Sequence, residues 1–345
     1  MDVAAYDYDL PDDRVAQTPV EPRHAARLLV DDWATVAVGH HRVADLAGLL
    51  RPGDLVVVND TRVIPARLHL RRASGAVVEV LLLEELGARA WEVLARPGRR
   101  IRPGEALGVG SVEEGTWTPV LEVGERLGEG RWSIRFLGDE AVERVLERLG
   151  EVPLPPYITA PLTDAERYQT VFARRPGSVA APTAGLHLTP QVLEELRARG
   201  IEVARIELVV GLGTFRPITS DRVEDHRMHG ERYVVPEETL AAIERTRARG
   251  GEVVAIGTTV VRALESWGTF GEVAGRTELF IHGDHRFLVV DRLLTNFHVP
   301  RSSLLVLLGA FVGDRWRALY EEALREGYRF LSFGDAMLVH RAHRR

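Results

Sequence analysis

Residues 152–345 alternate between amphipathic stretches and continuous apolar runs. In residues 190–199, Val192, Leu193 and Leu196 fall on one face, which predicts a helix ending at Gly200. The apolar run 201–210 that follows predicts a buried strand. The same patterns predict helices at 237–249, 258–266, 302–311 and 315–325, and strands at 54–58, 252–257 and 287–291. This alternation indicates an α/β domain with a mixed, largely covered sheet and flanking helices.

Residues 66–151 have a different pattern. Strand-like runs at 77–84, 90–96, 118–123 and 131–137 follow one another closely, separated by turns rich in glycine and proline. Such spacing is typical of a small β-barrel or sandwich. A helix-like run ending at Gly150 and the proline-rich connector VPLPPYI come next. We therefore expect a discontinuous α/β catalytic domain, 1–65 plus 152–345, with an inserted β-barrel domain at 66–151.

Composition narrows the class of protein. The chain has no cysteine, which excludes disulfides, thiolate metal sites and cysteine nucleophiles. Its most apolar stretch, SSLLVLLGAFVG, is too short to cross a bilayer, and the acidic start MDVAAYDYDLPDD is unlike a signal peptide. We expect a cytoplasmic protein with no membrane partner. The net charge of −6 argues against non-specific nucleic-acid binding but leaves room for a local arginine patch.

Small polar residues gather where predicted strands and helices meet. Five segments share this design: NDTR (59–62), PTAGLH (182–187), GLGTF (211–215), GTTVVR (257–262) and TNFH (295–298). Polar residues just past strand ends are where open α/β sheets bind ligands. Asx turns at 59–61 and helix caps at 258–259 explain the same residues without a ligand. GLGTF lacks the third glycine of a dinucleotide fingerprint, and GTTVVR is no phosphate-binding P-loop.

A sixth segment, DHRMHGERY (225–233), carries His226, His229 and Glu231. On a helix the two histidines would share a face, as in a metal site, but Gly230 interrupts and the spacing differs from H-E-x-x-H. We therefore expect no metal; acid–base work or substrate binding fits imidazole and carboxylate better. A structural histidine pair is the remaining alternative.

Arginines cluster at the turns of the predicted barrel, in 62–72 and in RPGRRIRPG (96–104). Arginine binds phosphate with two parallel hydrogen bonds, so one interpretation is an edge that contacts RNA. The other is a set of solvated turns.

Together these segments resemble the S-adenosylmethionine:tRNA ribosyltransferase-isomerase family of queuosine biosynthesis. The resemblance runs from YDYDLP at Tyr6 to FGDAML at Phe333. Its stretches are NDTRVIPARL, PGRRIRPG, VPLPPYI, ERYQTVFA, GSVAAPTAGLH, GLGTFRPI, HRMHGERY, GTTVVRALES, LLTNFH and YRFLSFGDAML. It implies a mixed α/β domain with a small inserted barrel, as the pattern above does.

The resemblance also implies a reaction. The family moves the ribosyl part of S-adenosylmethionine onto an aminomethyl-deazaguanine base at the tRNA wobble position, and adenine and methionine leave. S-adenosylmethionine is then a substrate, and no metal or other cofactor is expected. The expected partners are this small molecule and the anticodon loop of tRNA, bound by a monomer.

Such chemistry needs a base for the proton beside the sulfonium, a proton donor for adenine, and fixed partners for the sugar. The candidates for proton transfer are His187, His229, Glu231 and Asp60. The candidates for substrate binding are Asn59, Thr61, Arg62, Thr183, Gly185, Gly213, Thr214, Thr258, Thr259, Arg262, Asn296 and His298. The candidates for RNA binding are Arg67, Arg99, Arg100 and Arg102.

Several positions depart from the family pattern. His24 and Ala26 stand where Asp and Ser are expected, Val209 replaces a histidine, and Val260 replaces a serine. FIHGDHRF, with His282, Asp284 and His285, replaces a run with Pro-Gly and an aromatic residue. Three alternatives therefore stay open: a paralogue acting on S-adenosylmethionine or another nucleoside without tRNA, a non-catalytic RNA-binding protein, and a metal hydrolase.

Overall fold

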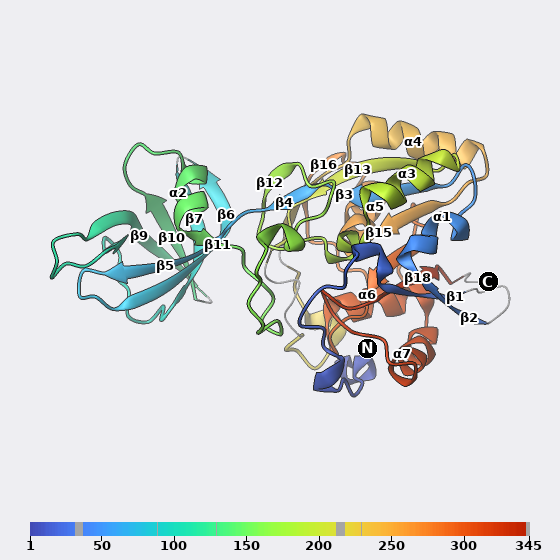
Figure 1. Cartoon of the computed structure of the whole chain (residues 1–345), viewed down its shortest axis with the longest axis horizontal. Helices are drawn as coiled ribbons and strands as arrows, with labels where there is room; N and C mark the ends of the chain where they lie inside the picture. Colours follow the sequence, from blue (N-terminus) through green and yellow to red (C-terminus); the bar gives the residue numbers. More distant parts are fainter. Residues whose placement is uncertain (32–36, 88, 129, 212–217, 229, 343–345) are drawn as a thin grey trace. The chain divides into compact units, whose positions relative to one another are not determined.

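The chain folds into two compact units. A computed structural model describes residues 1–31, 37–87, 89–128, 130–211, 218–228 and 230–342. One unit comprises Met1–Arg62 and Pro155–Arg345, and the other comprises Val63–Leu154 (Figure 1). The second unit is thus an insertion between two segments of the first.

The first unit is built on a nine-stranded mixed sheet in the order β16-β14-β13-β3-β15-β17-β18-β1-β2. The strands are β1 (Arg27–Asp31), β2 (Val38–Arg42), β3 (Leu55–Asn59), β13 (Glu202–Leu208), β14 (Glu231–Val234), β15 (Val253–Ile256), β16 (Ala274–Thr277), β17 (Arg292–Asn296) and β18 (Ala336–His340). The four central strands β13, β3, β15 and β17 run parallel, so their carboxyl ends lie at one edge of the sheet. Strand β4 (Thr61–Val63) pairs separately with β12 (Arg175–Ser178).

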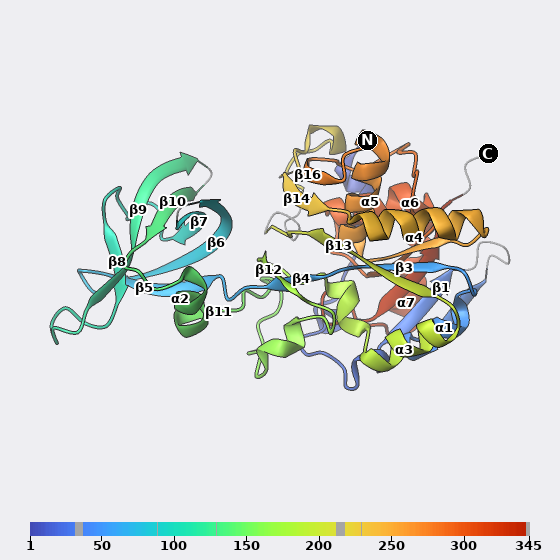
Figure 2. The ribbon, with the colours of Figure 1, turned by 90° about the horizontal axis from the view of Figure 1, so that it is seen from above.

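Helices cover both faces of this sheet (Figure 1, Figure 2). One face packs against α4 (Glu237–Ala248), α5 (Thr258–Phe270), α6 (Ser303–Val312) and α7 (Arg315–Arg325). The other packs against α1 (Leu46–Leu49) and α3 (Pro190–Ala198). Burial on both faces explains why the central strands read as continuous apolar runs.

The predicted helices of this unit agree with α3 to α7. Thr189 caps α3 by accepting a hydrogen bond from the Val192 N–H at 3.3 Å, and Gly200 beyond its end has φ of 74°.

The strand predicted at 287–291 is wrong. These residues form an irregular segment, and the neighbouring strand is β17, Arg292–Asn296. The fully buried carboxylate of Glu265 accepts hydrogen bonds from the backbone N–H groups of Leu288, Val289 and Val290, at 2.7, 3.0 and 2.9 Å. Because those donors are taken by a side chain, they cannot pair with a neighbouring strand.

The inserted unit is a closed antiparallel barrel. Its strands are β5 (Arg67–Arg72), β6 (Val77–Gly87), β7 (Ala90–Arg96), β8 (Ala106–Val109), β9 (Thr118–Gly128) and β10 (Arg131–Phe136). The order β5-β6-β7-β10-β9-β8 closes through pairing of β5 with β8. Helix α2 (Val142–Leu149) leads into β11 (Gly150–Glu151), which pairs with β5. In the ranges that the structure describes, no helix is long and apolar enough to span a membrane.

Candidate active site

A small cavity lies at the carboxyl edge of the central strands. It is lined by the residues that follow β15 (257–259) and those at the end of β17 (295–299). Residue 210 beyond β13 and residues 181–184, at the start of the short helix η6 (Thr183–His187), line it too. Three of the predicted polar turns therefore converge where α/β sheets usually bind ligands.

The cavity is tight in this conformation. Its volume is about 50 Å³, room for a few water molecules, whereas pockets for drug-sized ligands measure roughly 300–1,000 Å³.

The threonines at the start of α5 face the cavity. The residue before the helix is Gly257, with φ of 95° and ψ of 154°, a conformation that glycine adopts without strain. No side chain caps the helix, so Thr258 and Thr259 do not serve as its caps. Among the described residues, the buried Thr259 Oγ1 has no hydrogen-bond partner. It is therefore available to a ligand.

Asn296, at the end of β17, presents a second unpaired atom. Its Nδ2 lies 3.1 Å from the Leu331 carbonyl oxygen, 3.4 Å from the Asp335 carbonyl oxygen and 3.1 Å from His187 Nε2. The two carbonyls fix the orientation of the amide, because only the NH₂ end can donate to them. Asn296 Oδ1 is buried and has no hydrogen-bond partner within the described part of the chain. A buried unpaired acceptor costs stability, which a ligand donor would restore.

Two buried histidines stand at this site as neutral rings. Burial lowers the pKa of His187 to about 4, and the nearby Arg329 and Arg23 charges act in the same direction. Asn296 donates to Nε2 of His187, so the ring proton sits on Nδ1. Burial lowers the pKa of His298, which lines the cavity, to about 3. His298 Nε2 lies 3.0 Å from Thr295 Oγ1.

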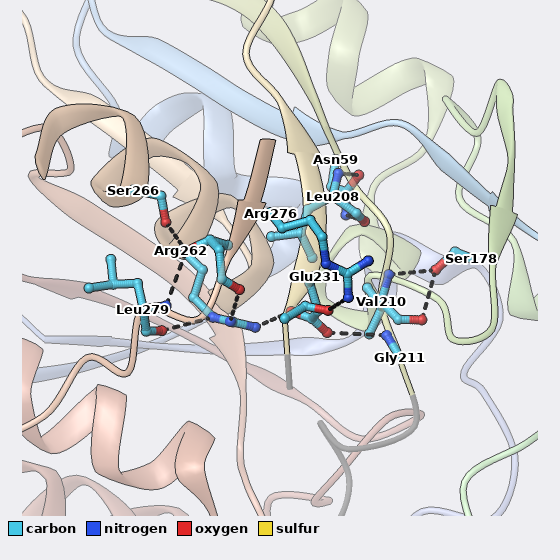
Figure 3. A network of polar contacts seen from close by, with 12 residues as sticks. Asn59, Ser178, Leu208, Val210, Gly211, Glu231, Arg262, Ser266, Arg276 and Leu279 are labelled. Atoms are coloured by element: carbon cyan, nitrogen blue, oxygen red, sulfur yellow. Dashed lines mark hydrogen bonds and ion pairs between the residues drawn. The ribbon is translucent and has the colours of Figure 1, made fainter. Parts of the chain in front are cut away.

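Glu231 and Arg262 form a buried ion pair beside the cavity wall (Figure 3). The other carboxylate oxygen of Glu231 accepts a hydrogen bond from the Gly211 N–H at 3.1 Å. Arg262 also donates to the carbonyls of Leu279 and Thr277, each at 3.3 Å. Glu231 thus holds the chain just after Val210, a residue that lines the cavity. This geometry gives the pair a positioning role.

Asn59 connects the end of β3 to Leu208 of β13 (Figure 3), and Thr61 Oγ1 donates to the Leu208 carbonyl at 3.4 Å. Asn59 Nδ2 donates to the Leu208 carbonyl at 2.9 Å, and its Oδ1 accepts from the N–H groups of Leu208 and Thr61, both at 3.2 Å. The contact with Thr61 N–H is an Asx turn. Ser178 links to Val210 in the same way, accepting from its N–H at 3.1 Å. These side chains hold the strand ends that carry the cavity wall.

Other predicted residues lie elsewhere. Gly185 packs under Phe172, whose Cζ would be 2.8 Å from an added Cβ, so the close approach there is made by a protein ring. Asp60 lines a separate surface depression with Arg175, and Arg62 forms an exposed ion pair with Glu166. His229, Gly213 and Thr214 fall outside the residues that the structure describes.

The predicted RNA-binding arginines belong to the inserted unit. Arg99, Arg100 and Arg102 are exposed on the turns after β7, and Arg67 is half-buried at the start of β5.

The described residues contain no group of three or more His, Asp or Glu side chains placed to hold a metal ion. The segment 226–228 is not helical, and His229, the second histidine of the predicted pair, lies outside the described residues.

Sequence reasoning did not select Tyr157 and Ser332. Their hydroxyl groups lie 2.7 Å apart in the cavity wall. Burial raises the pKa of Tyr157 to about 12, so it stays a neutral phenol. Both residues sit in stretches that carry the family resemblance, VPLPPYI and YRFLSFGDAML, but only the fold reveals that they meet.

The fold and the cavity define an α/β protein with an inserted barrel and a polar ligand site at the carboxyl edge of its sheet. Residues 3–339 match the family described as "Queuosine biosynthesis protein". The chain belongs to this family.

Similar proteins carry one name. The S-adenosylmethionine:tRNA ribosyltransferase-isomerase of Gloeobacter violaceus is 54% identical over 340 residues, covering 97% of this chain and 95% of that protein. The enzyme of that name from Rubrobacter xylanophilus is 52% identical, covering 96% of each. A crystal structure of S-adenosylmethionine tRNA ribosyltransferase from Thermotoga maritima aligns with TM-score 0.56 and 36% identity, covering 97% of this chain and 99% of that one.

The residues that depart from the family pattern occur in a chain that is similar to these enzymes over nearly its whole length. His24 Nδ1 lies 3.0 Å from Thr189 Oγ1, the cap of α3, and Val260 is fully buried in α5. At this level of identity over the whole chain, they are variations within the family.

Proposed function

We propose that this enzyme transfers and isomerises the ribosyl moiety of S-adenosylmethionine onto an aminomethyl-deazaguanine base at the tRNA wobble position. The product is epoxyqueuosine-tRNA, with release of adenine and methionine. The full-length likeness to enzymes of this name carries the proposal. The cavity at the carboxyl edge of the sheet supplies a place for the nucleoside.

The cavity's unpaired atoms support a division of labour. Asn296 Oδ1 accepts a hydrogen bond from a ligand N–H or O–H, and Thr259 Oγ1 donates to or accepts from a second polar atom. His187 acts one layer behind, by orienting the amide of Asn296. Thr183, Thr258 and His298 complete the polar wall.

The proposed residues for proton transfer come from the candidates that the sequence suggested. A sulfonium acidifies its neighbouring 5′ carbon, and a base must take that proton while adenine gains one on leaving. Both oxygens of Glu231 are engaged by Gly211 and Arg262, which favours positioning over proton transfer. We keep His229 as the candidate base, and Asp60 becomes the weaker one because it lies in a different depression. The reaction as proposed needs no metal or cofactor.

The tRNA contact is proposed on the exposed arginines of the inserted unit. Arg99, Arg100 and Arg102 suit phosphate, and an anticodon base is already single-stranded, so it enters a pocket at low cost. Arg67 would support this edge.

Adenine release from S-adenosylmethionine tests the proposal, measured with tRNA carrying the deazaguanine precursor, with tRNA lacking it, and without tRNA. Release that requires the precursor is the expected result. Release without tRNA would identify a paralogue that opens a free nucleoside, and no release together with tRNA binding would identify a non-catalytic RNA-binding protein. Full turnover by His229→Ala would remove that residue as the base.

A further inference from the structure

A groove on the α/β unit gathers three arginines away from the cavity. Arg174 precedes β12, Arg197 lies in the last turn of α3, and Arg205 lies on β13. Together they line a surface groove of about 780 Å³ whose apolar wall includes Phe172 and Leu193. We call this the arginine groove.

The backbone of all three residues is held by the scaffold. Arg174 and Arg175 both donate their backbone N–H groups to the Asp60 carbonyl, at 2.8 and 3.2 Å, which fixes this segment to the end of β3. Arg205 sits within the sheet, where it pairs with Val58 of β3, and its side chain is half-buried. Arg197 is placed by α3, which packs against β13.

Their charges are not balanced by ion pairs. Nearby arginines have such partners: Arg175 and Arg232 bind Glu207 at 3.0 and 2.7 Å. Across the described ranges, none of the three groove guanidinium groups has a carboxylate within ion-pair distance.

The interior of the groove points to a missing anionic partner. Arg205 Nε is buried and has no hydrogen-bond acceptor among the residues that the structure describes. Burial and the positive charges of Arg174 and Arg197 lower the pKa of Arg205, opposed in part by Asp60 and Glu238. Glu194, exposed on α3, is the one carboxylate among the groove's described lining residues. The groove's own lining therefore carries three arginines against one glutamate, while Arg174 and Arg205 also border a second depression whose lining includes Asp60, Glu202 and Glu238.

We propose that the arginine groove binds backbone phosphates of the tRNA, as a contact on the α/β unit additional to the inserted unit's arginine edge. The guanidinium fork matches phosphate oxygens, and the apolar wall suits a sugar or an unstacked base. Two of the arginines are exposed and reach a large partner, while Arg205 supplies the buried donor. This inference rests on the proposed function, because it takes tRNA as the substrate.

The test compares the wild-type enzyme with Arg174→Gln, Arg197→Gln, Arg205→Gln and the triple variant. The readouts are the Kd for precursor-bearing tRNA at several salt concentrations, and KM and kcat for adenine release. Each arginine that binds a phosphate should contribute about 0.7–0.9 to the slope of log K against log salt, so the triple variant should have a slope shallower by roughly two units. Its KM for tRNA should rise at least about tenfold. Because the groove is separate from the cavity, kcat at saturating tRNA and KM for S-adenosylmethionine should not change.

Two variants serve as controls. Arg249→Gln removes an equal charge from an exposed arginine at the end of α4 and should leave tRNA binding unchanged. Arg205→Lys keeps the charge but not the guanidinium fork, so it should retain the salt slope while weakening binding. Thermal unfolding of each variant shows whether it is folded, and Arg205→Lys carries the test if Arg205→Gln is not.

An unchanged salt slope and KM for tRNA in the folded single and triple variants would overturn the proposal, as would an equal effect of Arg249→Gln. Failure of the proposed function gives a different result. In that case the wild-type enzyme binds tRNA but releases no adenine, while the groove variants still report on RNA binding.

Discussion

Two buried histidines beside the cavity link the stability of the fold to pH. The pKa of His187 is lowered from 6.5 to about 4, and that of His298 to about 3. The unfolded chain therefore binds more protons than the folded chain between these values and 6.5. The contribution of these neutral histidines to the free energy of unfolding is fully present above pH 6.5 and is lost as the pH falls toward 4.

The first prediction follows from this difference. Between pH 7 and pH 4.5 the free energy of unfolding should fall by on the order of 3 kcal/mol for each histidine at most. Denaturant unfolding at several pH values measures it. His298→Gln should flatten the profile, whereas His69→Gln, at an exposed position of β5, should not. An identical pH profile for wild type and His298→Gln would contradict the buried neutral imidazole.

The second prediction concerns the unpaired hydroxyl of Thr259. Thr259→Val keeps the shape of the side chain and removes Oγ1, and with it a hydrogen bond to the ligand worth about 1 kcal/mol. KM for S-adenosylmethionine should rise roughly five- to tenfold with little change in stability. Thr246→Val, a buried threonine of α4 that does not line the cavity, is the matched control. Steady-state kinetics that show equal KM values for both variants would remove Thr259 from the substrate site.

The third prediction concerns the pair of Glu231 and Arg262. Glu231→Gln leaves a buried guanidinium without its counter-charge, which costs roughly 3–5 kcal/mol in typical buried pairs. The melting temperature should fall, and the double variant Glu231→Gln/Arg262→Met should recover part of the stability. Recovery in the double variant is the diagnostic outcome. A single variant as stable as the wild type would show that the pair does not hold the cavity wall.

At the scale of elements, the junction of β15 and α5 decides the shape of the site. Gly257 has a backbone conformation that glycine adopts without strain and other residues do not, and its N–H donates to the Leu294 carbonyl at 2.8 Å. An added Cβ would also lie 3.5 Å from Ala184 Cβ, across the cavity wall. The turn at Gly257 leads directly from β15 into α5 and places Thr258 and Thr259 in the cavity wall.

The fourth prediction tests this junction. Gly257→Ala should destabilise the protein by about 1–3 kcal/mol because of its backbone strain. Gly48 in α1 has an ordinary φ, and an added Cβ would meet only Arg199 Nη1, at 3.9 Å, so Gly48→Ala should be neutral or slightly stabilising. Chemical denaturation compares the two. If the two variants have equal free energies of unfolding, a side chain at position 257 does not strain the backbone.

Many of the helices and strands could be predicted from the sequence. Helices α3 to α7 follow from apolar periodicity with clear ends, such as Thr189 and Gly200. The strand expected at 287–291 failed because the pattern does not reveal that Glu265 binds three of its backbone donors. Long-range satisfaction of backbone groups by a side chain leaves no local signal.

Part of the candidate site could also be predicted from the sequence. Polar residues at the ends of parallel strands must meet at one edge, which is how Thr258, Thr259 and Asn296 were found. The meeting of Tyr157 with Ser332 depends on how distant loops cross, and no local pattern carries that. Asn59 forms the Asx turn with Thr61, one of the two roles that its sequence allowed, and it also bonds to Leu208 of β13.

At the scale of the whole molecule, the inserted barrel has its own closed hydrogen-bond ring and its own buried residues. Leu68, Leu70, Val78, Val80 and Val93 are fully or almost fully buried on its inner face. The unit spans Val63–Leu154, against the expected 66–151.

The fifth prediction is that Val63–Leu154 folds as an isolated fragment. Its barrel needs no strand of the other unit to close. Circular dichroism and a cooperative thermal transition measure this. A fragment that lacks β structure and a cooperative transition would show that the barrel depends on the rest of the chain.

The most direct test of the account is transfer of label from ribose-labelled S-adenosylmethionine into tRNA. Label should enter only tRNA with the deazaguanine precursor, and Asn296→Ala should strongly reduce transfer because the cavity loses its buried amide. Absence of transfer by the wild-type enzyme, or undiminished transfer by Asn296→Ala, would contradict it.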